Sequence, residues 1–153
     1  MLDKAHIGKN FGRLTTEVEK GRLRFFAKAI GETNPVFTDE AAARQAGYRS
    51  LPVPPTYFFC LPMLDDPDPT AWMTRLGVNL QNILHGEQSF EYFEMAFAGD
   101  RLTFETRITD IYDKKGGALE FLVTETTVVN QSDKPVAKMK CTAVIRHPGG
   151  NQK

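Results

Sequence analysis

The sequence predicts an α+β domain in which a buried helix is wrapped by a curved antiparallel sheet. Helix signals dominate the first half of the chain, and the alternation typical of strands dominates the second half. Between the two halves lies a short segment that is apolar on every side, as expected for a buried helix. The chain has 153 residues and contains no repeat or linker, so we expect residues 1–153 to fold as a single domain.

The first helix is expected to begin at Thr16, because Thr16 and Glu19 form the pattern of a capping box. Gly31 directly follows the last apolar residue at helical spacing and is a natural end for this helix. The apolar stripe of the helix would consist of Phe25, Phe26, Ala29 and Ile30.

A second, short helix is expected over residues 39–46, with Thr38 as its cap and Gly47 as its end. The buried helix follows over residues 56–61, where the side chains are mostly apolar. Pro62 should kink or end that helix, because proline cannot donate the next backbone hydrogen bond.

Four strands are expected in the second half of the chain, starting near Glu87. Turn residues at 99–100, 115–117 and 131–133 separate them. Consecutive strands joined by short turns form an antiparallel sheet with one covered face, and the buried helix is its natural cover. The apolar positions of the alternation are Leu102, Phe104 and Ile108, then Leu119, Phe121 and Val123, and finally Ala137, Met139, Cys141, Ala143 and Ile145.

Composition excludes several classes of function. Lys plus Arg and Asp plus Glu balance at 19 each, so neither nucleic acid nor a membrane surface is an expected partner. No apolar run approaches the ~18 residues of a membrane span, and the N-terminus lacks the apolar core of a signal peptide. We therefore expect a cytoplasmic protein.

Cofactor and metal chemistry are also not indicated. The histidines and cysteines have no metal-ligand spacing, and the chain has neither a Gly-x-Ser-x-Gly motif nor a glycine-rich phosphate loop. Cys60 and Cys141 lie far apart in apolar surroundings and are expected to be buried, unreactive thiols. We expect no cofactor and no metal.

Three separated segments carry a more specific pattern. Residues 31–43 contain Asn-Pro before an acidic helix start, residues 46–58 contain Pro-Pro-Thr, and residues 84–102 contain His-Gly-Glu-Gln and then Ala-Gly-Asp. In this order, and over nearly the whole chain, they resemble the MaoC-like family of (R)-specific enoyl-CoA hydratases and 3-hydroxyacyl dehydratases, particularly its dehydratase N-terminal domains. The resemblance implies a single hotdog fold, in which a sheet wraps a central helix.

The catalytic pair of that family is altered in this chain. In the family, an Asp and a His five residues later exchange protons with water and with the α-carbon of an acyl thioester. The resemblance places Glu32 and Phe37 at these positions, and phenylalanine has no exchangeable proton. A family glycine whose N–H polarises the thioester carbonyl falls at Pro55, which has no N–H, although Thr56 beside it could donate. Glu32 is therefore a degenerate catalytic position.

Three interpretations of the function stay open. The chain could be a non-catalytic subunit that works with a catalytic hotdog partner, or a self-sufficient enoyl-CoA hydratase that uses Glu32 and His85. It could also be a non-enzymatic module that binds acyl-CoA or another small ligand. The resemblance implies an acyl thioester of CoA or of acyl carrier protein as the ligand. Its binding candidates are Asn34, Phe37, Thr56, Tyr57 and Phe93, whereas Phe58 is expected to pack in the core.

The strand that enters the sheet is apolar on both faces, which is more than one covered face can bury. Its apolar side chains are Phe90, Tyr92, Phe93, Met95 and Phe97. Because family members build their tunnel between two hotdog units, we expect a homodimer of the isolated chain and a heterodimer with a catalytic hotdog subunit. No basic site for the phosphates of CoA or of phosphopantetheine is evident. Arg44, Arg49 and Arg75 are candidates, but single surface arginines are usually solvated.

Overall fold

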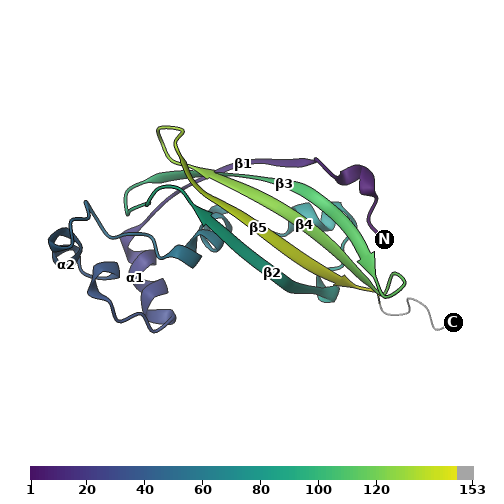
Figure 1. The fold of residues 1–153 in the computed structure, drawn as a ribbon, viewed down its shortest axis with the longest axis horizontal. Coiled ribbons are helices and arrows are strands. Elements are labelled where there is room, and N and C mark those ends of the chain that lie inside the picture. Colours follow the sequence, from purple (N-terminus) through teal and green to yellow (C-terminus); the bar gives the residue numbers. More distant parts are fainter. Residues whose placement is uncertain (148–153) are drawn as a thin grey trace.

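The computed structural model describes residues 1–147, which form one antiparallel sheet and several short helices. The sheet has five strands in the order β1-β3-β4-β5-β2 and arches over the helices (Figure 1). The predicted α+β class and antiparallel sheet are confirmed. The strands are β1 (Asn10–Glu17), β2 (Ile83–Tyr92), β3 (Arg101–Lys114), β4 (Leu119–Val129) and β5 (Pro135–Arg146).

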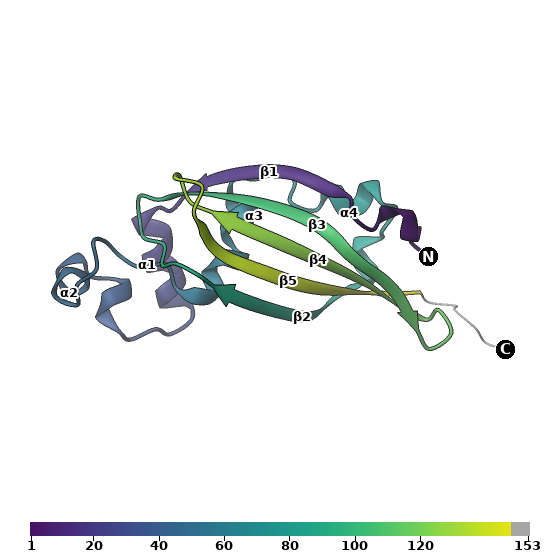
Figure 2. The same ribbon diagram turned by 45° about the horizontal axis from the view of Figure 1, so that its top comes forward.

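The helices lie on one side of the sheet and divide into two groups. The helices of residues 20–45 gather at one end of the sheet, and those labelled α3 and α4 lie behind it (Figure 2). Within residues 1–147, no helix is long and apolar enough to cross a membrane. The α-helices are α1 (Lys20–Ala29), α2 (Glu40–Gln45), α3 (Leu61–Asp65) and α4 (Ala71–Arg75), and the 3₁₀ helices are η1 (Lys4–His6), η2 (Pro35–Phe37), η3 (Pro55–Phe59) and η4 (Leu80–Asn82).

The prediction that a helix begins at Thr16 is wrong, because this residue lies in the edge strand β1. Thr16 is buried, and its hydroxyl donates a hydrogen bond to the Asp65 carboxylate. Helix α1 begins only after Glu19, whose carboxylate pairs with Arg22 at 3.0 Å rather than capping the helix. Pairing with β3 satisfies a whole row of backbone groups, which outweighs the local capping signal.

The buried stripe of α1 also differs from the prediction. Leu23 and Ala27 are buried one turn apart, and Phe26 packs against the same core. Phe25 is 74% exposed and Ile30 is 53% exposed, so these aromatic and aliphatic side chains face away from the sheet. The face of α1 that carries Leu23 and Ala27 packs against the core, and the face that carries Phe25 and Ile30 does not. The predicted stripe is wrong for Phe25, Ala29 and Ile30.

The second helix and both helix-ending glycines agree with the prediction. Gly31 and Gly47 adopt the left-handed φ values of +71° and +88° that favour glycine after a helix. The cap of α2 differs by one residue from the prediction. Asp39 rather than Thr38 starts α2, because its Oδ1 accepts hydrogen bonds from the backbone N–H groups of Ala41 and Ala42 at 2.7 and 3.1 Å.

The predicted buried helix is present as two short pieces, η3 and α3. Tyr57, Phe58 and Leu61 are buried beneath the sheet, as the apolar segment predicts. Pro62 lies in the first turn of α3, where its missing N–H costs no helical hydrogen bond, so it starts a helix instead of ending one.

Two hydrophobic clusters lie on the concave side of the sheet. The larger one forms beneath the end of the sheet near α1, η3 and α3, and the smaller one forms near α4. Buried members of the larger cluster include Leu23, Leu51, Phe58, Leu61, Leu102, Phe104, Val128 and Met139. Buried members of the smaller cluster are Val78, Ile108, Ile111, Leu122 and Ile145.

In β4 the prediction of covered positions is confirmed for Val123, which is buried, but is wrong for Leu119 and Phe121. Glu120, Leu122 and Thr124 are buried, whereas Phe121 is half-exposed and stacks on Tyr112 with ring centroids 4.8 Å apart. Both faces of this strand carry apolar side chains, so the alternation alone does not tell which face meets the core.

Asp100 joins three separate segments at the entry to β3. Its side chain is almost fully buried and accepts hydrogen bonds from Arg49, from the Phe97 backbone N–H at 2.8 Å, and from the Gln131 side-chain amide at 3.0 Å. The Arg49 guanidinium also lies 4.5 Å from the centroid of the Phe97 ring. Burial alone would raise the pKa of Asp100, but these hydrogen bonds outweigh it and hold the pKa below its ordinary value.

We predict that Asp100→Asn lowers the free energy of unfolding by about 2 kcal/mol at neutral pH, because an amide cannot serve all three donors. A depressed pKa stabilises the folded state above the unfolded pKa of about 4, and this contribution is lost as pH falls through the lower folded value. Urea unfolding from pH 7 to pH 3 should therefore show a smaller acid-induced loss in the variant than in the wild type. Asp113→Asn, at an exposed position, is the control; equal losses in both variants would contradict this role of Asp100.

Candidate functional site

The segment between α1 and α2 carries Glu32 and Phe37, which the resemblance in sequence predicts to lie at the acid and base positions. Glu32 follows Gly31, and its Oε1 accepts a hydrogen bond from the Asn34 backbone N–H at 2.8 Å. The Asn34 side chain in turn accepts from the Val36 N–H at 3.2 Å and starts η2. Both polar side chains therefore stabilise the turn in which they lie.

Phe37 ends η2 and is half-buried. Its backbone N–H donates to the Asn34 carbonyl at 3.3 Å, while its side chain offers neither a donor nor an acceptor. An apolar ring thus follows the Glu32 turn at the position where the sequence analysis expects the family histidine. A proton can be exchanged here by the Glu32 carboxyl group but not by residue 37.

The start of η3 corresponds to the predicted carbonyl-binding position. Pro55 lacks an N–H, and its carbonyl accepts a hydrogen bond from the Tyr92 hydroxyl at 2.8 Å, which joins η3 to the end of β2. Thr56 is exposed and supplies the first backbone N–H of this helix. Tyr57 is buried against Phe26, with ring centroids 4.6 Å apart, and burial raises the pKa of its phenol.

Phe93 lies apart from the other predicted binding residues. It is 50% exposed, and its N–H donates to the Val136 carbonyl at 2.9 Å. The ring borders a hollow of about 590 Å³ beside Thr127 and Lys138. These two alternate along their strands with the buried Val128 and Ala137, so they lie on the convex side. Tyr57 lies on the concave side, and the structure does not bring the two aromatic residues together.

His85, the second acid/base candidate, lies in β2 and is exposed. Its ring meets the Phe59 ring edge-on, with centroids 5.3 Å apart. Glu32 instead contacts Asn34 in the helical segment. The structure therefore does not join Glu32 and His85 into a pair.

A polar group in the middle of the concave face is missing from the sequence prediction. Gln88 of β2 pairs in register with Cys141, which pairs with Thr124 of β4, so a row of polar and thiol side chains separates the two hydrophobic clusters. The Oε1 atom of Gln88 is buried and has no hydrogen-bond partner within residues 1–147. A glutamine that alternates with Phe90 and Tyr92 along the strand is the sequence signal that could have identified it.

The chain can now be compared with known proteins. The family described as FAS1-like, dehydratase domain region, matches residues 5–139. The chain belongs to this family. It is 31% identical over 152 residues to a UPF0336 protein of Saccharopolyspora erythraea, covering 95% of this chain and 92% of that protein.

Solved structures agree with this family in their fold. The (3R)-hydroxyacyl-ACP dehydratase complex HadBC of Mycobacterium tuberculosis contains a chain with a TM-score of 0.76 and 24% identity, covering 91% of this chain and 96% of that one. A chain of the ChsH1–ChsH2 complex of the same organism has a TM-score of 0.75 and 20% identity, covering 97% of this chain and 89% of that one. A MaoC-like dehydratase of Phytophthora capsici has a TM-score of 0.69 and 28% identity, covering 92% of this chain and 47% of that one. The predicted MaoC-like hotdog fold is confirmed.

We predict that Glu32→Ala destabilises the protein by about 1 kcal/mol, because it removes the acceptor of the Asn34 N–H. Glu32→Gln keeps a side-chain oxygen in reach and should be close to the wild type. Urea unfolding measures both free energies. If the glutamine variant loses as much stability as the alanine variant, the negative charge of Glu32 stabilises this turn. The hydrogen bond from the Asn34 N–H to a side-chain oxygen would then not suffice.

Proposed function

We propose that this chain is an acyl-thioester-binding subunit of the (R)-specific enoyl-thioester hydratase and 3-hydroxyacyl dehydratase class, working with a catalytic hotdog partner. The observation that carries the proposal is Phe37, an apolar ring at the position where the family has its histidine. Glu32 is the remaining acid, and its carboxylate is bonded to the Asn34 N–H.

Reversible dehydration removes a proton from the α-carbon of a 3-hydroxyacyl thioester and the hydroxyl group from its β-carbon, and the two leave as water. Each proton needs a group that can take or give it within hydrogen-bond reach. In the proposal the partner supplies both groups, and this chain supplies walls that hold the acyl chain. Its binding candidates are Asn34, Phe37, Thr56, Tyr57 and Phe93.

The edge of the sheet supports an assembly of two hotdog units. Within residues 1–147, strand β2 pairs only with β5, so its other side offers backbone groups that no described strand pairs with. Large apolar side chains are exposed on this strand and just beyond it. Two structural neighbours, HadBC and ChsH1–ChsH2, are complexes of two different chains. The exposed apolar side chains are Leu84 (47%), Tyr92 (45%), Phe93 (50%) and Met95 (53%).

A self-sufficient hydratase using Glu32 is the second candidate, and the retained carboxyl group favours it. It needs a second proton-transfer group near Glu32, and His85 contacts Phe59 instead. A non-enzymatic module for acyl-CoA is the third candidate, and the same walls would serve it. We further propose that the protein acts in the cytoplasm.

We predict that the purified chain hydrates crotonyl-CoA poorly or not at all. A general acid or base contributes roughly 10²–10⁴-fold to the rate, so a site with an altered pair should be clearly impaired. Loss of the enoyl-thioester absorbance measures the reaction. Robust turnover that Glu32→Gln abolishes would support the self-sufficient hydratase and refute the subunit proposal.

We also predict that the isolated chain is a dimer at micromolar concentration through the β2 edge. Phe93→Glu should shift it towards the monomer, because the charge would be buried at the contact. Phe25→Glu is the matched control, since Phe25 is even more exposed but lies on α1. Light scattering coupled to gel filtration measures the mass. A monomeric wild type, or a dimer broken only by the control, would exclude the shared-edge assembly.

Co-expression tests the partner directly. A hotdog chain that retains the Asp and His pair should co-purify with this chain, and the complex should exceed the activity of that partner alone. If the chain dimerises but neither binds such a partner nor raises its activity, the binding-module function replaces the subunit function.

A further inference from the structure

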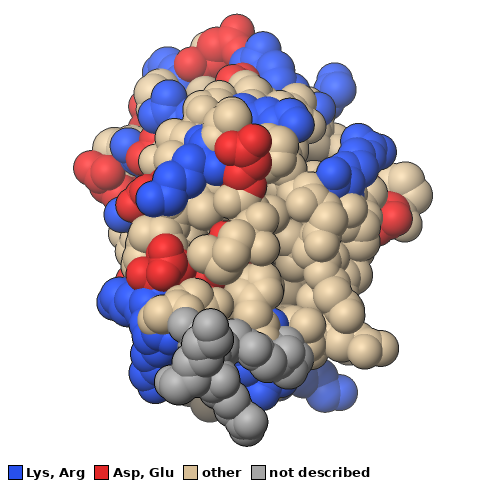
Figure 3. Space-filling model, turned by 90° about the vertical axis from the view of Figure 1, so that its right-hand side faces the viewer, with Lys and Arg blue, Asp and Glu red and all other residues tan. Residues whose placement is uncertain are grey.

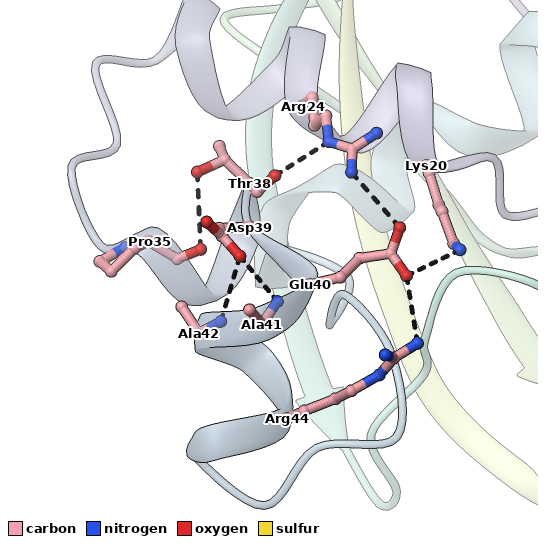
Figure 4. A network of polar contacts seen from close by, with 9 residues as sticks. All are labelled: Lys20, Arg24, Pro35, Thr38, Asp39, Glu40, Ala41, Ala42 and Arg44. Atoms are coloured by element: carbon pink, nitrogen blue, oxygen red, sulfur yellow. Dashed lines mark hydrogen bonds and ion pairs between the residues drawn. The ribbon is translucent and has the colours of Figure 1, made fainter.

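Three basic side chains converge on one carboxylate between α1 and α2 (Figure 4). Lys20 Nζ lies 2.9 Å from Oε2 of Glu40, and Arg44 lies 3.6 Å from the same oxygen. Arg24 lies 3.5 Å from Oε1. We call Lys20, Arg24 and Arg44 the basic triad.

The charges in this group do not balance. The side-chain hydrogen bond from Lys20, and the positive charges around it, lower the pKa of Glu40, so this carboxylate is ionised at neutral pH. One negative charge then faces three positive ones. The triad remains open to solvent, with Lys20 and Arg24 each 45% exposed and Arg44 69% exposed. The surplus positive charge is therefore accessible to an anion.

The triad is attached to the segment that carries the candidate site. The Nε–H of Arg24 donates to the Thr38 carbonyl at 2.9 Å, directly after Phe37. Residues 20–49 contain six Lys or Arg against three Asp or Glu, although the whole chain has no net charge. At the opposite end of the molecule, side chains of both signs are interspersed (Figure 3). Arg22 and Arg49 of this range pair with Asp65 and Asp100, so the surplus is concentrated around Glu40. This local surplus is hidden when the arginines are considered one by one along the sequence.

We propose that the basic triad binds a phosphate ester of the group that carries the acyl thioester. This inference rests on the proposed function. Arginine recognises phosphate through paired N–H donors, and lysine adds a point charge. Glu40 holds the three side chains together before the ligand arrives, at the cost of some attraction for it. CoA and the phosphopantetheine arm of a carrier protein both present such a phosphate.

The chain contains a comparable arrangement that serves as a control. On β3, β4 and β5, Arg107 and Lys138 flank Glu125 at 2.7 and 2.8 Å. This trio is a cross-strand ladder with two cations for one carboxylate, far in sequence from the candidate site. Equivalent substitutions there change the same kinds of charge without touching the triad.

Calorimetric titration of the full chain with desulfo-CoA at low salt tests the proposal. Arg44→Gln should weaken binding roughly three- to tenfold, because it removes a charge-assisted contact from an exposed position that does not hold the fold. Glu40→Gln should strengthen binding about threefold, because it removes the competing negative charge. Arg107→Gln and Glu125→Gln should leave binding unchanged. Thermal unfolding of each variant verifies that it is folded.

Two further ligands separate the sources and the two proposals. Butyryl-pantetheine has no phosphate, so its binding reports the acyl site alone and should not respond to Arg44→Gln. A phosphopantetheinylated carrier protein that responds to the triad while desulfo-CoA does not would identify the carrier protein as the source of the phosphate. The phosphate site is overturned if Arg44→Gln affects neither phosphate-bearing ligand, or if Glu40→Gln weakens both in a folded protein. Absence of butyryl-pantetheine binding would instead contradict the proposed acyl site.

Discussion

Burial of Leu51, Val53, Tyr57, Phe58 and Leu61 beneath the sheet is the constraint on which the rest of the structure depends. The Val53 N–H donates to the Ala96 carbonyl and the Ala98 N–H to the Leu51 carbonyl, both at 2.9 Å. These bonds fix the buried segment to the chain entering β3, where Asp100 gathers Arg49 and Gln131. The covering helices therefore cannot shift without disturbing β3. Their short length still suffices because each piece contributes large buried side chains.

How much of this could be predicted from the sequence depends on the range of the forces involved. Gly31, Gly47 and the turns at 115–117 and 131–133 depend on local backbone conformation, and the sequence identifies them. Strand β1 and the covered face of β4 depend on pairing with distant residues, which overrides the signal of Thr16 and leaves Phe121 ambiguous. Within the candidate site, the Glu32 turn also depends on a local contact, because its hydrogen bond joins residues only two positions apart.

Neither the contact of the Tyr92 hydroxyl with Pro55 nor the convergence of charges on Glu40 follows from spacing along the chain. Lys20 and Arg24 are neighbours on α1, and Arg44 joins them only because the tertiary fold brings Glu40 of α2 within reach of both helices' basic side chains. The separation of Phe93 from Tyr57 also depends on distant parts of the chain, because Tyr57 packs beneath the sheet while Phe93 follows the end of β2 and stays half-exposed.

The packing of α1 and α2 explains how the acid/base positions can change while the helical segment keeps its fold. Lys20 and Arg24 of α1 reach Glu40 of α2, and Arg24 also holds the Thr38 carbonyl. Phe37 contributes only its backbone to the hydrogen bonds of this region. The Phe37 side chain takes no part in the hydrogen bonds and ion pairs that join the two helices. Proton transfer demands a specific atom within hydrogen-bond reach, whereas holding an apolar ligand demands only shape and apolar surface. Position 37 can therefore serve the second task but not the first.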